Sequence, residues 1–312
     1  MIITVTFNPA IDKTAEVEEL KVGGLNRLSN VMQDAGGKGV NVSKTIKAFG
    51  GETLCTGFLA GSAGEYIDHT LKDLHINTNF VWVEGMTRTN LKVLDKDMEL
   101  TELNEAGPLI GEVEVEQLKQ KICELCKNDS IVVLSGNVSK GVDTNIYYEL
   151  INEIKKSGSR VVFDADGELF AKGIQAKPLV IKPNKYELAT YFGVSQDVDN
   201  KEIISLAKTL LNEDTKYVVV SMGKQGAIFI TQDQVILAEA LKVEAHSSVG
   251  AGDAMVAGIT YAIEQGYSLE EMIRFAVAAS AGAVMTKGTQ PASMEVVKEL
   301  KNKVVLTTLE EN

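Results

Sequence analysis

The chain has 312 residues, 45% of them hydrophobic and 24% charged, an ordinary balance for a globular protein with a large core. Its formal net charge of −12 argues against nucleic acid or an anionic membrane as a main partner, because both require a basic face. No apolar run approaches the ~20 residues of a membrane helix, and the first residues lack the features of a signal peptide. We therefore expect a cytoplasmic protein.

Short, nearly continuous apolar runs predict strands that are buried on both faces of a parallel sheet. They lie at residues 2–7, 54–59, 131–134, 160–163, 179–181 and 217–220. Between most of them, apolar residues recur at helical spacing, at 38–49, 63–74, 114–127, 143–156, 201–212, 250–265 and 268–286. The alternation predicts an α/β fold with helices on both faces of the sheet. Within 114–127, Cys123 and Cys126 are expected on the core face of the helix.

Two segments interrupt this alternation, at about 12–34 and 88–105. Polar and apolar residues alternate there at strand period, as in Leu91, Lys92 and Val93. The segments predict exposed antiparallel strands that form a small separate sheet, which needs another surface to bury its apolar face. We expect one domain over residues 1–312 that carries this sheet.

An aspartate lies directly behind a glycine-rich turn at the start of the predicted helix 250–265. Gly250, Ala251 and Gly252 have little or no side chain, so their N–H groups can approach an anion at the positive end of the helix. Asp253 would then lie within reach of a hydroxyl that attacks the same phosphate. The alternative is a plain strand-to-helix turn, in which the aspartate complements the helix dipole.

A second glycine cluster, at residues 35–39, also opens a helix. Two such helix starts, more than two hundred residues apart, suggest that two anionic or polar groups are held face to face. Neither cluster matches the P-loop or the dinucleotide fingerprint. A Walker-type ATPase and a dinucleotide dehydrogenase are therefore disfavoured.

The stretches 36–43 and 249–254 resemble the two signatures of the ribokinase-like carbohydrate kinases, the phosphofructokinase B family. Five further motifs follow in the order found in that family, at 8–12, 87–90, 101–104, 181–188 and 220–227. The resemblance implies a three-layer α/β/α sandwich. It also implies that the segments 12–34 and 88–105 form a β-sheet lid over a sugar site, and that two subunits pair through their lids as a homodimer.

The resemblance further implies a kinase that transfers a phosphoryl group from ATP to a phosphorylated ketohexose. Asp253 is then the general base, and the N–H groups of Gly250, Ala251 and Gly252 hold the transferred group. The stretches 87–92 and 101–104 are most similar to those of members that convert fructose 1-phosphate into fructose 1,6-bisphosphate by phosphorylation at C6. Tagatose 6-phosphate, phosphorylated at C1, is the alternative acceptor, and a regulator that binds a sugar phosphate without chemistry is the alternative class.

By the same resemblance, the sugar is held by polar and glycine positions: Asp12, Gly36, Gly37, Asn41, Asn90 and Asn137. Arg88 and Arg27 lie in the lid segments. Because a guanidinium matches phosphate with two hydrogen bonds, these arginines are expected to clamp the phosphate that the acceptor already bears. Lys38 either faces solvent or neutralises a phosphate.

Asn184 and Glu187 are spaced i, i+3 at a helix start after Pro183, which places both side chains on one face. They can cap the helix, and the resemblance implies that they also organise Mg²⁺ and its waters near the ATP phosphates. The residues expected to bind the nucleotide are Lys182, Asn184, Ser221, Gly223 and Gly226.

Overall fold

The computed structural model describes residues 1–97 and 99–309, so position 98 of the predicted lid segment 88–105 lies outside the described residues. A large sheet has the strand order β15-β14-β13-β12-β11-β10-β9-β1-β4-β5, with β6 paired to β4. Its strands are β1 (Ile2–Thr6), β4 (Thr53–Leu59), β5 (Asn77–Thr78), β6 (Val81–Trp82), β9 (Ile131–Ser135), β10 (Arg160–Asp164), β11 (Val180–Ile181), β12 (Tyr217–Ser221), β13 (Ala227–Ile230), β14 (Val235–Ala238) and β15 (Leu306–Thr308). All six predicted strands are confirmed.

The parallel strands are apolar throughout because both of their faces are covered. In β9, Ile131 and Val133 join the core on one face of the sheet, whereas Val132 and Leu134 join the core on the other. Successive side chains of a strand point to opposite faces. A strand covered on both sides therefore reads as a continuous apolar run.

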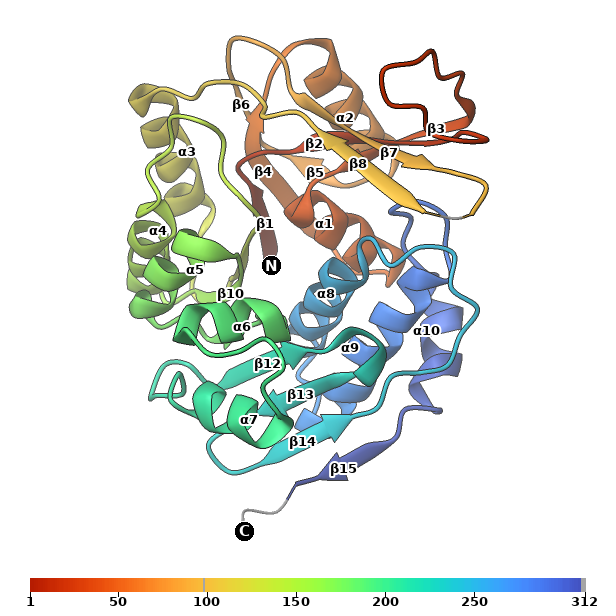
Figure 1. The fold of residues 1–312 in the computed structure, drawn as a ribbon. Helices are drawn as coiled ribbons and strands as arrows, with labels where there is room; N and C mark the ends of the chain where they lie inside the picture. The colour runs from red at the N-terminus through yellow and green to blue at the C-terminus, as the bar shows by residue number, and fades with distance from the viewer. Residues whose placement is uncertain (98, 310–312) are drawn as a thin grey trace.

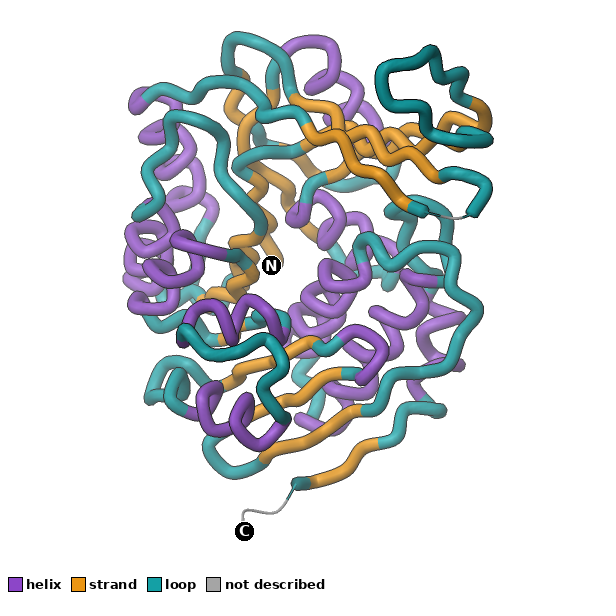
Figure 2. Tube along the Cα trace, in the orientation of Figure 1, coloured by secondary structure: helices purple, strands orange, loops and turns teal. Residues whose placement is uncertain are grey.

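Helices cover both faces of the large sheet (Figures 1 and 2). One layer contains α1 (Lys38–Ala48), α2 (Gly61–Asp73), α8 (Ala251–Glu264), α9 (Leu269–Val284) and α10 (Met294–Lys301). The other contains α3 (Glu112–Leu125), α4 (Ile146–Lys156), α5 (Gly167–Gly173), α6 (Lys185–Phe192) and α7 (Asn200–Lys208). The predicted three-layer α/β/α sandwich is confirmed.

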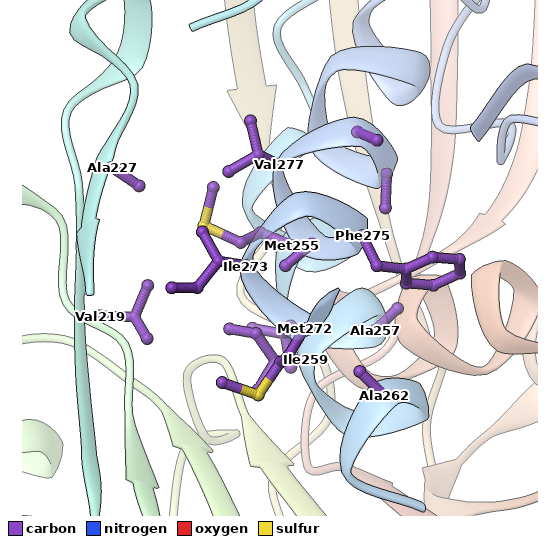
Figure 3. Close-up of a cluster of buried hydrophobic side chains, with 14 of the residues drawn as sticks. Val219, Ala227, Met255, Ala257, Ile259, Ala262, Met272, Ile273, Phe275 and Val277 are labelled. Carbon is purple, nitrogen blue, oxygen red and sulfur yellow. The ribbon is translucent and has the colours of Figure 1, made fainter. Parts of the chain in front are cut away.

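Close packing of α8 on α9 and on the sheet fixes the position of the N-terminus of α8. Figure 3 shows Met255 of α8 and Ile273 of α9 beside Val219 of the sheet, within one apolar cluster. A Cβ on Gly258 would lie 2.7 Å from the Cα of Ala276, so only glycine allows the two helices to approach this closely.

Several features of the fold differ from the sequence-based expectation. β13, β14 and β15 run antiparallel to their neighbours, so the sheet is mixed. The helices α5 and α10 were not predicted, because segments of 7 and 8 residues are too short to show a helical period. Cys123 is exposed while Cys126 is buried. Cys123 directly follows the buried Ile122, and one residue turns a helix by about 100°.

The predicted side sheet is present as β3-β2-β7-β8, called the lid sheet below. Its strands are β2 (Ala10–Glu16), β3 (Ser29–Gly36), β7 (Arg88–Leu94) and β8 (Leu100–Asn104). β2 pairs with β7 in parallel, whereas the other two pairings are antiparallel as expected. The lid sheet lies across the end of the large sheet in Figure 1. Within the described residues, no helix has the length and apolar character to cross a membrane.

Candidate active site

The main cavity, of about 890 Å³, lies between the lid sheet and the C-terminal ends of the parallel strands. β1 stands between β4 and β9 in the sheet, so the chain leaves β1 toward one side and later returns on the other. Open α/β sheets hold their ligands at such a switch point. Polar groups from the lid strands β2 and β7, from the starts of α1, α6 and α8, and from the end of β10 line the cavity.

The turn before α8, which the sequence predicted to bind an anion, leaves two backbone N–H groups free at the start of a helix in the described structure. Gly250 is the N-cap residue, with a φ of 81° that favours glycine. The Ala251 N–H donates to Ser248 O over a long 3.5 Å, while the N–H groups of Gly250 and Gly252 make no hydrogen bond within the described residues. Gly250 and Gly252 line the main cavity. The turn therefore presents free donors at the positive end of a helix.

Asp253 points its carboxylate into the same cavity, where Asn41 of α1 holds it. Asn41 Nδ2 donates to Asp253 Oδ2 at 2.8 Å, and Asp253 is only 8% exposed. Burial raises the pKa of Asp253 to about 6; Lys38 opposes this rise and Asp164 adds to it. The carboxylate is thus ionised at neutral pH but is a stronger base than an exposed aspartate, which suits a general base.

Asp164, which the sequence reasoning missed, joins the two lysines of the cavity. It is the last residue of β10 and is 2% exposed. Its Oδ1 lies 3.4 Å from Lys38 Nζ and 3.2 Å from Lys182 Nζ. Burial raises the pKa of Asp164, but the two ammonium groups outweigh it, so that the pKa is lowered. A charged residue at the end of the apolar run 160–163 was the signal that could have revealed it.

This cluster settles where Lys38 lies. Its ammonium group lines the cavity beside Asp164, with a side chain that is 34% exposed. Burial lowers the pKa of Lys38, but the neighbouring carboxylates, led by Asp164 and Asp253, raise it overall. Lys182 Nζ lies 3.7 Å from the place where a Cβ on Gly252 would be. Both lysines can therefore meet an anion that is held by the turn.

The lid sheet brings a carboxylate and its partners to the opposite wall. Asp12 Oδ1 accepts from Asn90 Nδ2 at 3.1 Å and lies 3.3 Å from Lys92 Nζ. A Cβ on Gly36 would lie 2.4 Å from Asp12 Oδ2, so glycine at this position makes room for the carboxylate. Lys92 was not predicted as a site residue, although it lies at every second position with Arg88 and Asn90 and therefore shares their face of the lid strand β7.

Two buried amide oxygens of residues that line the cavity make no hydrogen bond within the described part of the chain. Asn41 Oδ1 and Asn90 Oδ1 have no hydrogen-bond partner among the described residues, and both side chains line the cavity. Because buried acceptors are normally satisfied, these oxygens fit ligand groups that donate hydrogen bonds, such as sugar hydroxyls.

Arg88 is a lid cation that no carboxylate pairs with in the described part of the chain. Its Nε donates to Asn8 O at 3.2 Å, and its side chain lines the cavity. Burial lowers the pKa of Arg88, while the negative charge of Asp12 opposes the change. Its terminal nitrogens are thus available for an anionic ligand.

Asn184 and Glu187 form a complete capping box at the start of α6. Asn184 Oδ1 accepts from the Glu187 N–H, and Glu187 Oε2 accepts from the Asn184 N–H, each at 2.8 Å. Both side chains also line the cavity. Among the described residues, no group of three acidic, histidine or cysteine side chains could hold a metal. Mg²⁺ does not require one, because it keeps several waters and binds one or two carboxylates together with phosphates; Glu187 and Asn184 fit that role.

A second cavity, of about 620 Å³, adjoins the first at Gly223. Gly226 and Ala251 line it, together with apolar side chains such as Leu241 and Met255. Ser221 lies in the main cavity. An apolar cavity beside a turn with free backbone N–H groups is suited to a flat, largely apolar ring such as a nucleotide base.

Three predicted substrate contacts do not line the main cavity: Gly36, which adjoins Asp12 instead, and two loop residues, Arg27 and Asn137. Arg27 is exposed in the loop between β2 and β3. Asn137 is exposed, and its Oδ1 accepts from the adjacent Val138 N–H at 2.8 Å. The sequence could not predict where the side chains of Arg27 and Asn137 lie, since both residues are in loops whose course depends on the surrounding fold.

The sequence pattern of the pfkB family carbohydrate kinases matches residues 5–296. The chain belongs to this family. It is 35% identical over 303 residues to a 1-phosphofructokinase of Bacillus subtilis, which covers 96% of this chain and 99% of that protein. It is 30% identical over 276 residues to a tagatose-6-phosphate kinase of Staphylococcus epidermidis, with coverages of 88% and 89%. The phosphofructokinase-2 from Escherichia coli, crystallised with substrates and products, has a TM-score of 0.91 and 28% identity, and 97% of this chain and 98% of that chain are covered.

This pfkB-family chain is therefore a sugar-phosphate kinase with the ribokinase-like fold, as the sequence motifs predicted. ATP is the phosphoryl donor that such a kinase uses. The geometry described above places the candidate base, the anion-binding turn and the lid cations around one cavity.

Proposed function

We propose that the chain phosphorylates fructose 1-phosphate at its C6 hydroxyl and yields fructose 1,6-bisphosphate. The observation that carries this proposal is Arg88, an unpaired lid cation in the described structure that lines the same cavity as Asp253. A desolvated guanidinium left without an anion is costly. Lid closure is therefore favourable over an acceptor that already bears a phosphate, and unfavourable over a neutral sugar.

The reaction needs a base at the hydroxyl and a positive field around the transferred group. Asp253 takes the proton of the attacking hydroxyl, and the N–H groups of Gly250 and Gly252 receive the phosphoryl oxygens. Lys38 and Lys182, held on Asp164, neutralise the charge that spreads over the phosphates. Such preorganised donors supply much of the rate enhancement in phosphoryl transfer.

Asp12 and Asn41 orient the sugar between these groups. The Asp12 carboxylate, fixed by Asn90 and Lys92, accepts hydrogen bonds from sugar hydroxyls. The free Asn41 oxygen accepts another, while the Asn41 amide keeps Asp253 in place. The lid that carries Asp12 excludes water, which would otherwise compete for the phosphoryl group.

ATP is expected to place its base in the second cavity and its phosphates at the turn. Mg²⁺, bound between the phosphates and the Asn184 and Glu187 oxygens, would neutralise phosphate charge. The capping box already fixes both side chains toward the cavity.

Tagatose 6-phosphate is the second candidate acceptor, because a chain 30% identical to this one is a tagatose-6-phosphate kinase. The furanose ring is nearly symmetric, so one phosphate clamp can accept either end of a ketohexose. For tagatose 6-phosphate, the attacking hydroxyl would be that of C1.

The proposal is tested by kcat/KM for fructose, fructose 1-phosphate, fructose 6-phosphate and tagatose 6-phosphate, with the wild type and Arg88→Ala. We expect fructose 1-phosphate to rank first, free fructose to be at least a hundredfold poorer, and Arg88→Ala to remove most of that difference. Arg160→Ala, at the start of β10, is the control for loss of an arginine elsewhere. Equal use of free fructose, or an unchanged ranking in Arg88→Ala, would refute the clamp.

We further propose that the chain forms a homodimer through the lid sheet. The lid sheet has an apolar surface on one face: the exposed Leu103 of β8 lies opposite Leu91 of β7, and both line a cavity with Leu28 of the loop that precedes β3. A small sheet with an uncovered apolar face needs a partner surface, and a second lid sheet supplies one of matching shape and chemistry.

Leu103→Glu should therefore convert the dimer into a monomer in sedimentation equilibrium, since the charge would be desolvated in the interface. Leu103 is 55% exposed and Leu109, outside the lid sheet, is 68% exposed. Leu109→Glu is thus the matched control and should remain dimeric. A wild-type monomer, or a Leu103→Glu dimer, would contradict pairing through the lid.

A further inference from the structure

A second buried carboxylate of the lid sheet, Asp34, lies next to the substrate cavity without lining it. It lies directly opposite Asp12 in the β2–β3 pairing and is 8% exposed. Its Oδ1 accepts a hydrogen bond from Gln290 Nε2, which belongs to the loop after α9. The lid is therefore tied to a loop that is 256 residues away along the chain.

The backbone of this loop, residues 285–290, is shaped to meet Asp34. A Cβ on Gly288 would lie 2.6 Å from Asp34 Oδ2, and Gly288 has a φ of 62°. Any larger residue would collide with the carboxylate, so glycine permits the close approach. Beside Asp34, Lys44 Nζ donates to Ala35 O at 2.6 Å, which anchors the same end of β3 to α1.

The other side of the loop lies next to the turn before α8, and the end of α9 that leads into the loop is hydrogen-bonded to the segment before that turn. Thr289 is 7% exposed, and its Cγ2 lies 3.9 Å from the place where a Cβ on Gly250 would be. At the end of α9, Val284 O accepts from the His246 N–H at 2.7 Å and from the Ser247 N–H at 3.3 Å. Both N–H groups belong to the segment that leads into Gly250.

We propose that Asp34 is a positioning residue that, through Gln290 and the loop 285–290, holds the Gly250 turn in the geometry required for phosphoryl transfer. The inference rests on the proposed function of that turn. The contact between Asp34 and Gln290 joins the lid, which binds the sugar through Asp12, to the turn that receives the phosphoryl group. When the lid is closed over the acceptor, the same contact holds the Gly250 turn in line for phosphoryl transfer.

The size of the expected loss in kcat follows from how strongly phosphoryl transfer depends on geometry. Loss of one donor to a developing oxyanion costs about 10²–10³ in rate, and a misplacement of about 1 Å costs about 10². Removal of the Asp34–Gln290 contact loosens the turn but leaves its donors in the chain. We expect a fall in kcat of about tenfold, with little change in the KM for ATP.

The test is a double-mutant cycle with Asp34→Ala, Gln290→Ala and the double variant, assayed with whichever phosphosugar the wild type uses fastest. Each single variant should lose about tenfold in kcat, and the double variant no more than the poorer single variant, because both remove one contact. Glu16→Ala is the matched control: Glu16 Oε2 also accepts from a side-chain amide, that of Asn30, at 2.6 Å, but within the lid. It should keep kcat within twofold of the wild type.

A second measurement does not depend on turnover. Amide hydrogen exchange of residues 248–254 should be at least threefold faster in Gln290→Ala than in the wild type or Glu16→Ala, at an unchanged melting temperature. Multiplicative losses of kcat in the double variant, or unchanged exchange and kcat in Gln290→Ala, would overturn the proposal. If the wild-type enzyme does not phosphorylate fructose 1-phosphate but phosphorylates another phosphosugar, only the proposed substrate is refuted.

Discussion

At the scale of single residues, the proposed base is held in an environment that opposes its charge. Asp253 is buried, and its pKa is raised to about 6 from an ordinary 3.8. Between these two pH values the unfolded chain binds fewer protons at this residue than the folded chain does. The contribution of Asp253 to the free energy of unfolding therefore falls as the pH rises through this window and stays low above it.

Asp253→Asn should abolish activity and yet stabilise the fold. We expect kcat to fall at least about a hundredfold, because a general base contributes about 10²–10⁴. At pH 8 the free energy of unfolding should rise by roughly 1–3 kcal/mol, since about two pKa units correspond to about 3 kcal/mol, while the Asn41 contact can persist. Urea unfolding at pH 4 and pH 8 and steady-state kinetics measure both effects.

The stabilisation by Asp253→Asn should disappear near pH 4, where wild-type Asp253 is protonated. Asp233→Asn, at an exposed aspartate between β13 and β14, should change neither quantity. If Asp253→Asn retained a tenth of the wild-type kcat, Asp253 would not be the base. A loss of stability at pH 8 would contradict the buried charge.

How far the sequence predicted the site depended on whether a residue lay in a local motif. Asp253, Asn41, Gly250 and Gly252 lie in helix starts whose glycine pattern is visible in the sequence, and all four line the cavity. Asp164 and Lys92 escaped because their roles depend on partners that only the fold brings near, Lys182 and Asp12 respectively. The pairing of Asp34 with Gln290 spans most of the chain and left no local signal.

At the scale of elements, the start of α6 combines a structural and a proposed catalytic role. The sequence left open whether Asn184 and Glu187 cap the helix or hold Mg²⁺, and the capping box is confirmed. The metal role stays a prediction. Burial raises the pKa of Glu187, so its charge is held at a cost that a bound cation would offset.

Glu187→Gln separates these two roles, because glutamine keeps the capping box but loses the charge. We expect an unchanged melting temperature and a Mg²⁺ concentration for half-maximal rate that is at least about fivefold higher, since one carboxylate ligand is lost. Glu271→Gln, in the corresponding capping box at the start of α9, is the control and should alter neither. An unchanged Mg²⁺ titration for Glu187→Gln would remove Glu187 from the metal site.

At the scale of the whole molecule, the apolar periodicity of the sequence was enough to predict the layers but not the complete topology. The parallel strands were found because burial on both faces leaves continuous apolar runs, and the long helices because their apolar residues recur at helical spacing. The edge strands β14 and β15 were not, since strands of three or four residues carry too few positions to define a period. The lid sheet was located from its alternation, but its parallel β2–β7 pairing depends on contacts across 78 residues, such as Asn90 with Asp12.

The central claim is that this fold joins a phosphate-recognising lid to a base and an anion-binding turn in order to phosphorylate fructose 1-phosphate at C6. The most direct test is ³¹P and ¹³C NMR of the product formed from fructose 1-phosphate, ATP and Mg²⁺, with Asp253→Asn as the control. The account predicts fructose 1,6-bisphosphate, with new phosphorus coupling at C6, from the wild type alone. Binding of fructose 1-phosphate without turnover, or an equal yield of bisphosphate from Asp253→Asn, would contradict it.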